Sequence, residues 1–158
     1  MKFLCLALTI AAAAADGTVT CNVLTAQNPH CQGTCTTSGS VVRGQNFTIT
    51  AEGSCDTEVD GATYHVDGKF AGLPVINHDC ADACQDSDFA VGGVLNMGHM
   101  YIGGAACPVT TSQKLSIVSH AFVATSAPKG TLTTELVAKD TSAAKNILLD
   151  IQVIVTMD

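Results

Sequence analysis

The sequence has no tryptophan, 4 prolines and an aromatic content of 4%. Basic side chains are also scarce: 7 Lys and Arg stand against 14 Asp and Glu, which gives a formal net charge of −7 at pH 7. The chain has no basic cluster, and this argues against binding to nucleic acid and against charge-driven adhesion to anionic membranes. The composition therefore argues against nucleic acid and anionic membranes as partners, but it does not indicate which partner the protein has.

After its N-terminus the chain lacks an apolar stretch of about 18 residues, the length that crosses a membrane. Residues 1–15, MKFLCLALTIAAAAA, combine a basic start, a short apolar run and small residues. This pattern predicts a secretory signal peptide. The remaining residues, 16–158, are about as many as one domain needs to bury its own core. We therefore expect one exported domain over residues 16–158.

Catalytic motifs are missing as well. The chain has no GxSxG, HExxH or phosphate-binding glycine loop, and its acidic residues gather in loops rather than in facing pairs. His78-Asp79-Cys80 is a lone cluster, which we interpret as an exposed loop, and His120 fits a strand face without a role. The sequence predicts no catalytic residue, no cofactor and no metal site, and hence a protein that is not an enzyme.

Cysteine is the feature that the chain has in plenty. Cys5 belongs to the leader, and the other seven fall in the exported domain: Cys21, Cys31, Cys35, Cys55, Cys80, Cys84 and Cys107. An exported chain favours disulfides, here three at most with one thiol left over. Cys31 and Cys35 are close enough to close a small local ring; a metal site is the competing interpretation, but it needs further ligands at matching spacing. Asn46-Phe47-Thr48 is a sequon for N-linked glycosylation.

Apolar residues alternate with polar ones in most of the chain, as expected for strands with one buried face. The clearest case is the closing stretch 146–157, with Ile147, Leu149, Ile151, Val153 and Val155 on one face. Other expected strands cover 17–25, 41–52, 62–66, 69–75, 115–125 and 132–139, whereas 27–40 reads as loop after Asn28-Pro29. No stretch after the leader has a helical period. Strands at short intervals with turns between them predict an antiparallel β-sandwich.

Residues 76–106 have no clear pattern. Asp79, Asp82, Asp86 and Asp88 would suggest calcium, but they do not follow the twelve-position calcium loop, and a solvated acidic loop is the simpler interpretation. The run FAVGGVLNMGHMYIGG is compatible with a lid, an extra hairpin or a flexible insertion. The aliphatic core has no tryptophan seal, yet tight packing is the commoner outcome in such cores. The residues alone thus leave a ligand cavity open.

Four stretches in order resemble the ML lipid-recognition domain family, which includes the Niemann-Pick type C sterol carriers and the group 2 mite allergens. They are RGQNFTITAEG (43–53), VDGKFAGLPV (66–75), ACPV (106–109) and Ala127-Pro128, followed by the alternating apolar end. The resemblance covers the whole exported domain. It implies an all-β, immunoglobulin-like antiparallel sandwich of seven strands with an apolar cavity between the sheets, and no catalysis.

The resemblance also implies a function. We expect a lipid-binding and transfer protein, secreted or in the lysosomal or vacuolar lumen, that carries a sterol, fatty acid or phospholipid as a monomer and delivers it to a receptor or an acceptor membrane. The alternative is a non-enzymatic extracellular recognition module. The residues expected to line the cavity are Phe47, Ile49, Val66, Val75, Val123, Leu132, Leu136, Leu149, Ile151 and Val153.

Departures from the family pattern refine these expectations. Sterol carriers of the family have aromatic residues where this chain has Asn77 and Ala127, which argues against a sterol ring. Leu148 stands where the partner of the family's early cysteine would fall, so Cys21 is expected to pair elsewhere, with Cys55 as a candidate. The family's other two bridges would then be Cys31 with Cys35 and Cys80 with Cys107, leaving Cys84 in an insertion that could cover the cavity mouth.

Overall fold

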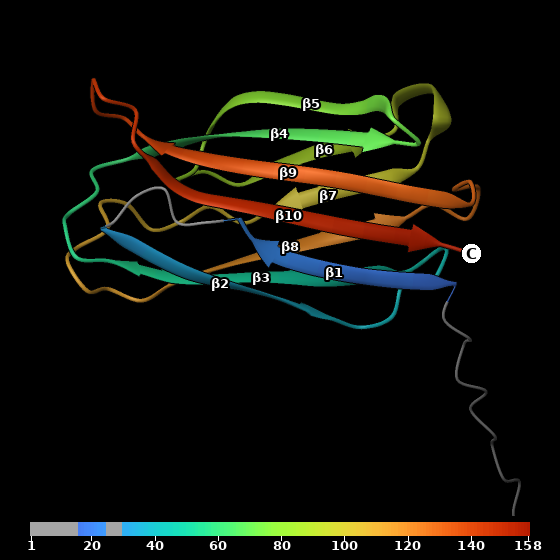
Figure 1. Ribbon diagram of the computed structural model, residues 1–158, viewed down its shortest axis with the longest axis horizontal. Helices are drawn as coiled ribbons and strands as arrows, with labels where there is room; N and C mark the ends of the chain where they lie inside the picture. The colour runs from blue at the N-terminus through green and yellow to red at the C-terminus, as the bar shows by residue number, and fades with distance from the viewer. Residues whose placement is uncertain (1–15, 25–29) are drawn as a thin grey trace, which may run out of the picture.

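A computed structural model describes residues 16–24 and 30–158 (Figure 1). The expected signal peptide and the Asn28-Pro29 break lie outside these residues. The described part holds ten strands and one short 3₁₀ helix, η1, at Gly93–Leu95. The strands are β1 (Gly17–Val23), β2 (Cys31–Ser38), β3 (Asn46–Cys55), β4 (Ala62–Phe70), β5 (Leu73–Asp82), β6 (Ser87–Val91), β7 (Gly98–Ile102), β8 (Leu115–Val123), β9 (Gly130–Asp140) and β10 (Ile147–Met157).

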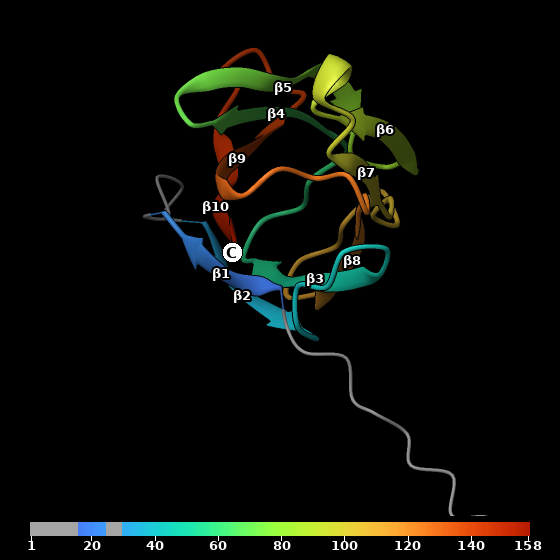
Figure 2. The same ribbon diagram turned by 90° about the vertical axis from the view of Figure 1, so that its right-hand side faces the viewer.

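The strands form two five-stranded antiparallel sheets. Sheet A has the order β1-β10-β9-β4-β5, and sheet B has the order β2-β3-β8-β7-β6. Viewed from the end, the sheets face each other, with β1 beside β2 at one edge and β5 beside β6 at the other (Figure 2). The expected all-β sandwich is confirmed, although the described residues form ten strands rather than seven.

The closing strand β10 lies between β9 and β1, with Ile151, Val153, Val155 and Met157 buried against the opposite sheet. Its outward positions include Gln152 and Thr156, as the alternation predicts. The pairing of β10 with β9 is irregular between Ile147 and Leu149. This irregularity lies at the start of β10, where Leu148 and Leu149 line the first apolar compartment described below.

Two segments differ from the sequence expectations. β2 is a strand, not a loop: its inward Cys31, Gly33 and Cys35 alternate with outward polar residues, and it pairs with β3 along its whole length. The segment 76–106 completes β5 and then forms an extra hairpin, β6 and β7, at the edge of sheet B. Of the three alternatives left open by the sequence, the hairpin is therefore the correct one.

Three disulfides join Cys21 to Cys35, Cys31 to Cys55, and Cys84 to Cys107, while Cys80 is a free, exposed cysteine. All three expected pairings are thus wrong. The first bridge links β1 of sheet A to β2 of sheet B, the second joins residues directly opposite each other in β2 and β3, and the third connects the loops on either side of the β6–β7 hairpin. β2 is consequently fixed at two points to its neighbours.

Candidate functional site

An apolar space runs lengthwise between the two sheets and is divided into three compartments. The first compartment, of about 100 Å³, lies where β3 ends and where β4, β8 and β10 begin; Leu115, Leu148 and Leu149 are among its walls. The central compartment, of about 70 Å³, is walled by Ile49 and Ile117 of sheet B and by Leu136 and Ile151 of sheet A. The third, of about 30 Å³, lies at the other end of the strands.

The compartments are neighbours along one row. Five residues line both the first and the central compartment: Ala51, Ala83, Ile117, Ala138 and Leu149. Met100, Thr134 and Val153 line both the central and the third. The shared walls make one apolar groove that only a few side chains interrupt. Such a row has the shape of an extended chain rather than of a compact ring system.

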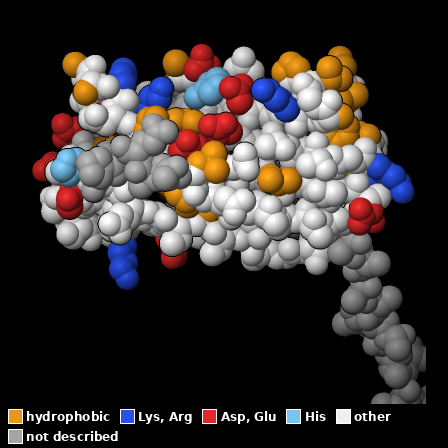
Figure 3. Space-filling view, in the orientation of Figure 1, with side chains coloured by type: hydrophobic (Ala, Val, Ile, Leu, Met, Phe, Trp, Pro, Cys, Tyr) orange, Lys and Arg blue, Asp and Glu red, His pale blue; other side chains and the backbone are white. Residues whose placement is uncertain are grey.

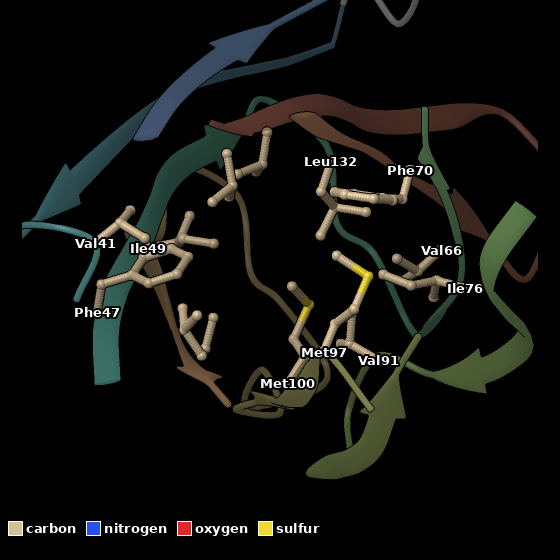
Figure 4. Packing of buried hydrophobic residues seen from close by; sticks show 14 of the residues in the cluster. Val41, Phe47, Ile49, Val66, Phe70, Ile76, Val91, Met97, Met100 and Leu132 are labelled. Atoms are coloured by element: carbon tan, nitrogen blue, oxygen red, sulfur yellow. The ribbon is translucent and has the colours of Figure 1, made fainter. Parts of the chain in front are cut away.

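The third compartment is closed by the segment that follows β6. Figure 4 shows Phe47 and Ile49 of β3 on one side and Phe70 and Leu132 of sheet A on the other, with Met97 and Met100 directed between them. Met97 is 3% exposed and Met100 7% exposed. Long, unbranched methionine side chains fill irregular gaps and readily change rotamer. Met97 and Met100 thus close this end of the groove from the side of the β6–β7 hairpin.

Arg43 holds the same end together from outside. Its Nε donates to the carbonyl oxygen of Ala127 at 2.9 Å, and its Nη1 and Nη2 each donate to the carbonyl oxygen of Asp158 at 3.3 Å. Its backbone amide donates to Oδ2 of Asp16 at 2.8 Å. The guanidinium joins the β8–β9 turn to the two ends of the described domain. This end is therefore more firmly closed than the end with the first compartment.

The first compartment has a wall made of glycine. Gly33 and Gly53 are directly opposite each other in β2 and β3, and both line the space. Several of its aliphatic residues, among them Leu115, Leu148 and Leu149, are only half-buried. The missing side chains of Gly33 and Gly53 leave space beside Leu149 of the opposite sheet. This end is the open one.

Of the ten residues expected to line a cavity, nine do so. Ile49, Val66, Leu136, Leu149, Ile151 and Val153 line the central compartment, and Phe47, Val123 and Leu132 line the third. Val75 is half-buried and packs against the core, outside the described walls of the three compartments. Sequence reasoning missed Tyr64, Met97, Met100 and Ile117; alternation along 115–125 would have found Ile117, which has the same parity as Ala121 and Val123.

Two polar groups lie close to the groove on the β4–β5 side. Tyr64 is 4% exposed, and burial raises the pKa of its hydroxyl. Ser87 is near enough to moderate that pKa, but no hydrogen bond of ordinary geometry reaches the hydroxyl within the described residues. His78 also has a buried, unpartnered Nε2 and stacks on Phe89 with ring centroids 4.3 Å apart. The expectation of an exposed loop for His78 is therefore wrong, because β5 extends through it and turns it inward.

The outward face of sheet A carries carboxylates around one histidine. His65 on β4 contacts Asp67 through Nε2 at 2.8 Å and Asp79 through Nδ1 at 3.1 Å. Figure 3 shows histidine and acidic side chains grouped on this face. The hydrogen bond that the His65 ring donates to Asp67 is the main cause that raises the pKa of His65, and burial opposes it. Asp150 on β10 has a raised pKa because of burial and, second, the charge of Glu135.

The remaining acidic residues of the expected acidic loop have local partners. Oδ1 of Asp82 accepts from the amide of Cys84 at 2.9 Å, and Oδ1 of Asp86 accepts from the amide of Gly104 at 2.8 Å. Asp88 contacts Nδ1 of His99 at 3.5 Å. Within residues 16–24 and 30–158, no group of three or more His, Cys, Asp and Glu is placed to hold a metal ion. The described part also has no helix long and apolar enough to cross a membrane.

The fold and the site define a class: an all-β sandwich whose sheets enclose an apolar groove. The model of the ML domain family matches residues 18–154, and the chain therefore belongs to that family. None of the curated proteins matches. Among solved structures, a Niemann-Pick type C2 protein from the Japanese carpenter ant is similar, with 11% identity, a TM-score of 0.47, and coverage of 89% of this chain and 91% of that one. Family membership and the apolar groove support lipid binding in general.

Proposed function

We propose that this protein is a secreted or endolysosomal carrier that binds a lipid tail between its sheets and delivers it without chemical change. The observation that carries the proposal is the row of apolar compartments joined by shared walls. Burial of alkyl surface contributes about 25 cal/mol per Å², so the groove supplies affinity without specific polar contacts. The site lies wholly within one chain, so the carrier needs no second copy to bind its ligand.

The size of the space narrows the ligand class. A cavity of about 150 Å³ is enough for a benzene-sized guest, whereas whole drug-sized ligands take about 300 Å³ or more. The first compartment of about 100 Å³ is below both values, and the central one is smaller still. A linear chain of a fatty acid or phospholipid therefore fits this groove better than a sterol. Loading a full chain requires Met97 and Met100 to move aside.

The residues that replace the aromatics of the sterol carriers agree with this choice. Asn77 is exposed and pairs with Asp67 on the outward side of sheet A. Ala127 is 5% exposed and its carbonyl accepts from Arg43. Neither position offers the groove a flat ring surface. We therefore place fatty acids and phospholipids before sterols as ligands.

Delivery needs contact with a membrane, and two exposed hairpin tips support it. Leu73, the first residue of β5 after the β4–β5 turn, is 64% exposed, and Val94 and Leu95 of η1 are 103% and 40% exposed. The tips are tied together by a hydrogen bond from the amide of Gly92 to the carbonyl of Val75 at 3.1 Å. Figure 3 shows hydrophobic side chains gathered at the end of the molecule where β4 turns into β5. Exposed apolar side chains of this kind mark contact surfaces.

Uptake is tested with a fluorescent fatty acid and a fluorescent sterol. Ile151→Phe adds volume inside the central compartment, and we expect a loss of fatty-acid affinity of about tenfold or more, equal to about 1.4 kcal/mol. Ile154→Phe on the outward side of the same strand is the matched control and should bind normally. Ile151→Asp should abolish uptake, although burying an unpaired charge also weakens the fold. A folded wild-type protein that takes up neither probe would refute carriage.

A second candidate function is an extracellular recognition module that holds no lipid. The exposed tips at Leu73, Val94 and Leu95 favour it, because a receptor can contact them as well as a membrane can. The double substitution Leu73→Ser and Val94→Ser separates the two functions. A carrier so altered should take up the fatty acid normally but transfer it more slowly to phosphatidylcholine vesicles. If the protein is a recognition module instead, neither the wild type nor the double variant should take up the fatty acid.

A further inference from the structure

The outward face of sheet B is aromatic over its β7–β8 half. His99 and Tyr101 of β7 and Val118, His120 and Phe122 of β8 form what we name the aromatic face. Tyr101, Val118 and Phe122 are 36%, 38% and 39% exposed. The rings of Tyr101 and His120 lie 6.1 Å apart with an angle of 20° between their planes. The face is a continuous surface of rings and methyl groups on two neighbouring strands.

The other half of the same sheet has a different composition. Its outward positions on β2 and β3 are polar throughout, and four of them are threonine: Thr34, Thr36, Thr48 and Thr50. A one-sided antiparallel sheet usually presents polar residues to water along all its strands. The aromatic face breaks that rule on β7 and β8 only. An apolar face with this sharp a boundary indicates that something covers it.

Asn46 of the glycosylation sequon stands on that boundary. It is exposed at the start of β3 and pairs directly with Phe122 of β8, which in turn pairs with His99 of β7. Directly paired residues in antiparallel strands share a face, with Cβ atoms about 4.5–5.5 Å apart. Asn46, Phe122 and His99 therefore form one row across three strands. The second row consists of Thr48, His120 and Tyr101, in the same order.

We propose that Asn46 carries an N-linked glycan whose first sugars lie along this row and cover the aromatic face. The apolar C–H side of a pyranose ring carries slight positive charge and packs on the electron-rich face of an aromatic ring. A sugar ring is about as wide as the spacing of neighbouring strands, about 4.8 Å. The first sugar thus reaches Phe122 and the second reaches His99. This occupant is attached to the chain itself, so its effective concentration over the face is high.

Polar groups around the face suit sugar hydroxyls. Asp88 contacts His99 at 3.5 Å and is exposed at the far edge of the rows. Asp86 hydrogen-bonds to the hydroxyl of Tyr101, which lowers the pKa of Asp86 and raises that of Tyr101. These carboxylates are acceptors for the hydroxyls of a glycan that crosses from β3 to β6. The proposal does not depend on lipid carriage, because the side chains of the face alternate with the inward ones, although His99 and Phe122 also border the third compartment.

The test is a thermal double-mutant cycle on protein secreted from a eukaryotic host, with occupancy of Asn46 measured by intact mass. Asn46→Gln, or enzymatic removal of the glycan from the folded protein, should lower Tm by about 2–4 °C, the shift that about 1 kcal/mol causes in a domain of this size. In a Phe122→Ser background the same removal should lower Tm by clearly less, because only the contacts with His99 and the neighbouring carboxylates remain. Trimming the glycan to its first sugar should keep part of the effect.

A relocated glycan is the control. Thr131→Asn creates a sequon on the outward side of β9 in sheet A, away from the aromatic face, and combined with Asn46→Gln it should not restore Tm. An unoccupied Asn46 overturns the proposal. So does an equal loss of Tm with and without Phe122, or a glycosylated wild-type protein that light scattering shows to dimerise until Phe122→Ser makes it monomeric. The last outcome would assign the aromatic face to a second copy of the chain.

Discussion

Gly33 of β2 lies against Leu149 of β10 across the groove, so that a Cβ atom built on Gly33 would be 3.2 Å from Cδ1 of Leu149. The two residues belong to different sheets, and both line the first compartment. The first compartment owes its width to Gly33, because any larger side chain at this position would extend into the compartment. This contact also marks the open end of the groove, opposite the end closed by Arg43.

Gly33→Leu should therefore block the first compartment. We expect fatty-acid affinity to fall about tenfold, which corresponds to about 1.4 kcal/mol, measured by fluorescence titration. Thr34→Leu places the same side chain on the outward face of the same strand and should bind as the wild type does. Equal affinity of the Gly33→Leu variant and the wild type would show that lipid does not occupy this end.

Native alkylation tests the disulfide assignment. Cys80 is the free, exposed cysteine of the described residues, and its thiol donates to Oδ1 of Asp79. That contact is the main cause that raises the pKa of Cys80 and slows its reaction. A thiol reagent should still modify one site per folded, mature chain, located by mass spectrometry, and Cys80→Ser should abolish the modification without a change in Tm. Labelling at Cys84 instead would restore the pairing suggested by the family resemblance.

The disulfides show why the fold could be predicted from the sequence whereas the pairing of the cysteines could not. Cys21, Cys31, Cys35 and Cys55 all have inward positions near one edge, and several pairings have acceptable sequence spacing. The register of β2 against β3 places Cys31 opposite Cys55, and the contact of β1 with β2 leaves Cys35 to Cys21. Register depends on how two strands pair and cannot be deduced from either strand alone. The polar composition of β2 also led us to expect a loop in place of this strand.

The sequence allowed the residues that line the groove to be predicted, but not the volume of the groove. Period-two alternation identified Ile151 and Val153 as inward, because alternation is a local property of the chain. The empty space depends instead on a mismatch between two sheets, such as Gly33 and Gly53 facing Leu149. Such a mismatch needs the relative position of strands that are distant in sequence. Val75 shows the reverse error, an inward residue without a space beside it.

Tyr64→Phe removes a hydroxyl that is buried without a hydrogen-bond partner of ordinary geometry among the described residues. An unsatisfied buried polar group costs about 1–3 kcal/mol, and its removal recovers part of that cost. We expect the urea midpoint of Tyr64→Phe to equal or exceed that of the wild type, with a gain of up to about 1 kcal/mol. A loss of more than about 1 kcal/mol would indicate that Ser87 forms a full hydrogen bond with this hydroxyl.

The pH dependence of stability should follow His65. Its pKa is raised in the folded protein, chiefly by the hydrogen bond with Asp67, so folding favours the protonated imidazole. The stabilisation is fully present below the unfolded pKa of about 6.5 and is lost as the pH rises through the folded pKa. Asp150 acts in the same direction, because its raised pKa means that the protein becomes more stable as its carboxyl gains a proton.

We therefore expect urea midpoints to be higher at pH 5 than at pH 8. His65→Gln should be less stable than the wild type at pH 5 and nearly equal to it at pH 8. Asp67→Asn removes the main cause of the pKa shift and leaves Asp79, so it should keep only part of the pH dependence. Parallel curves for the wild type and His65→Gln between pH 5 and pH 8 would show that this histidine does not stabilise the acidic form.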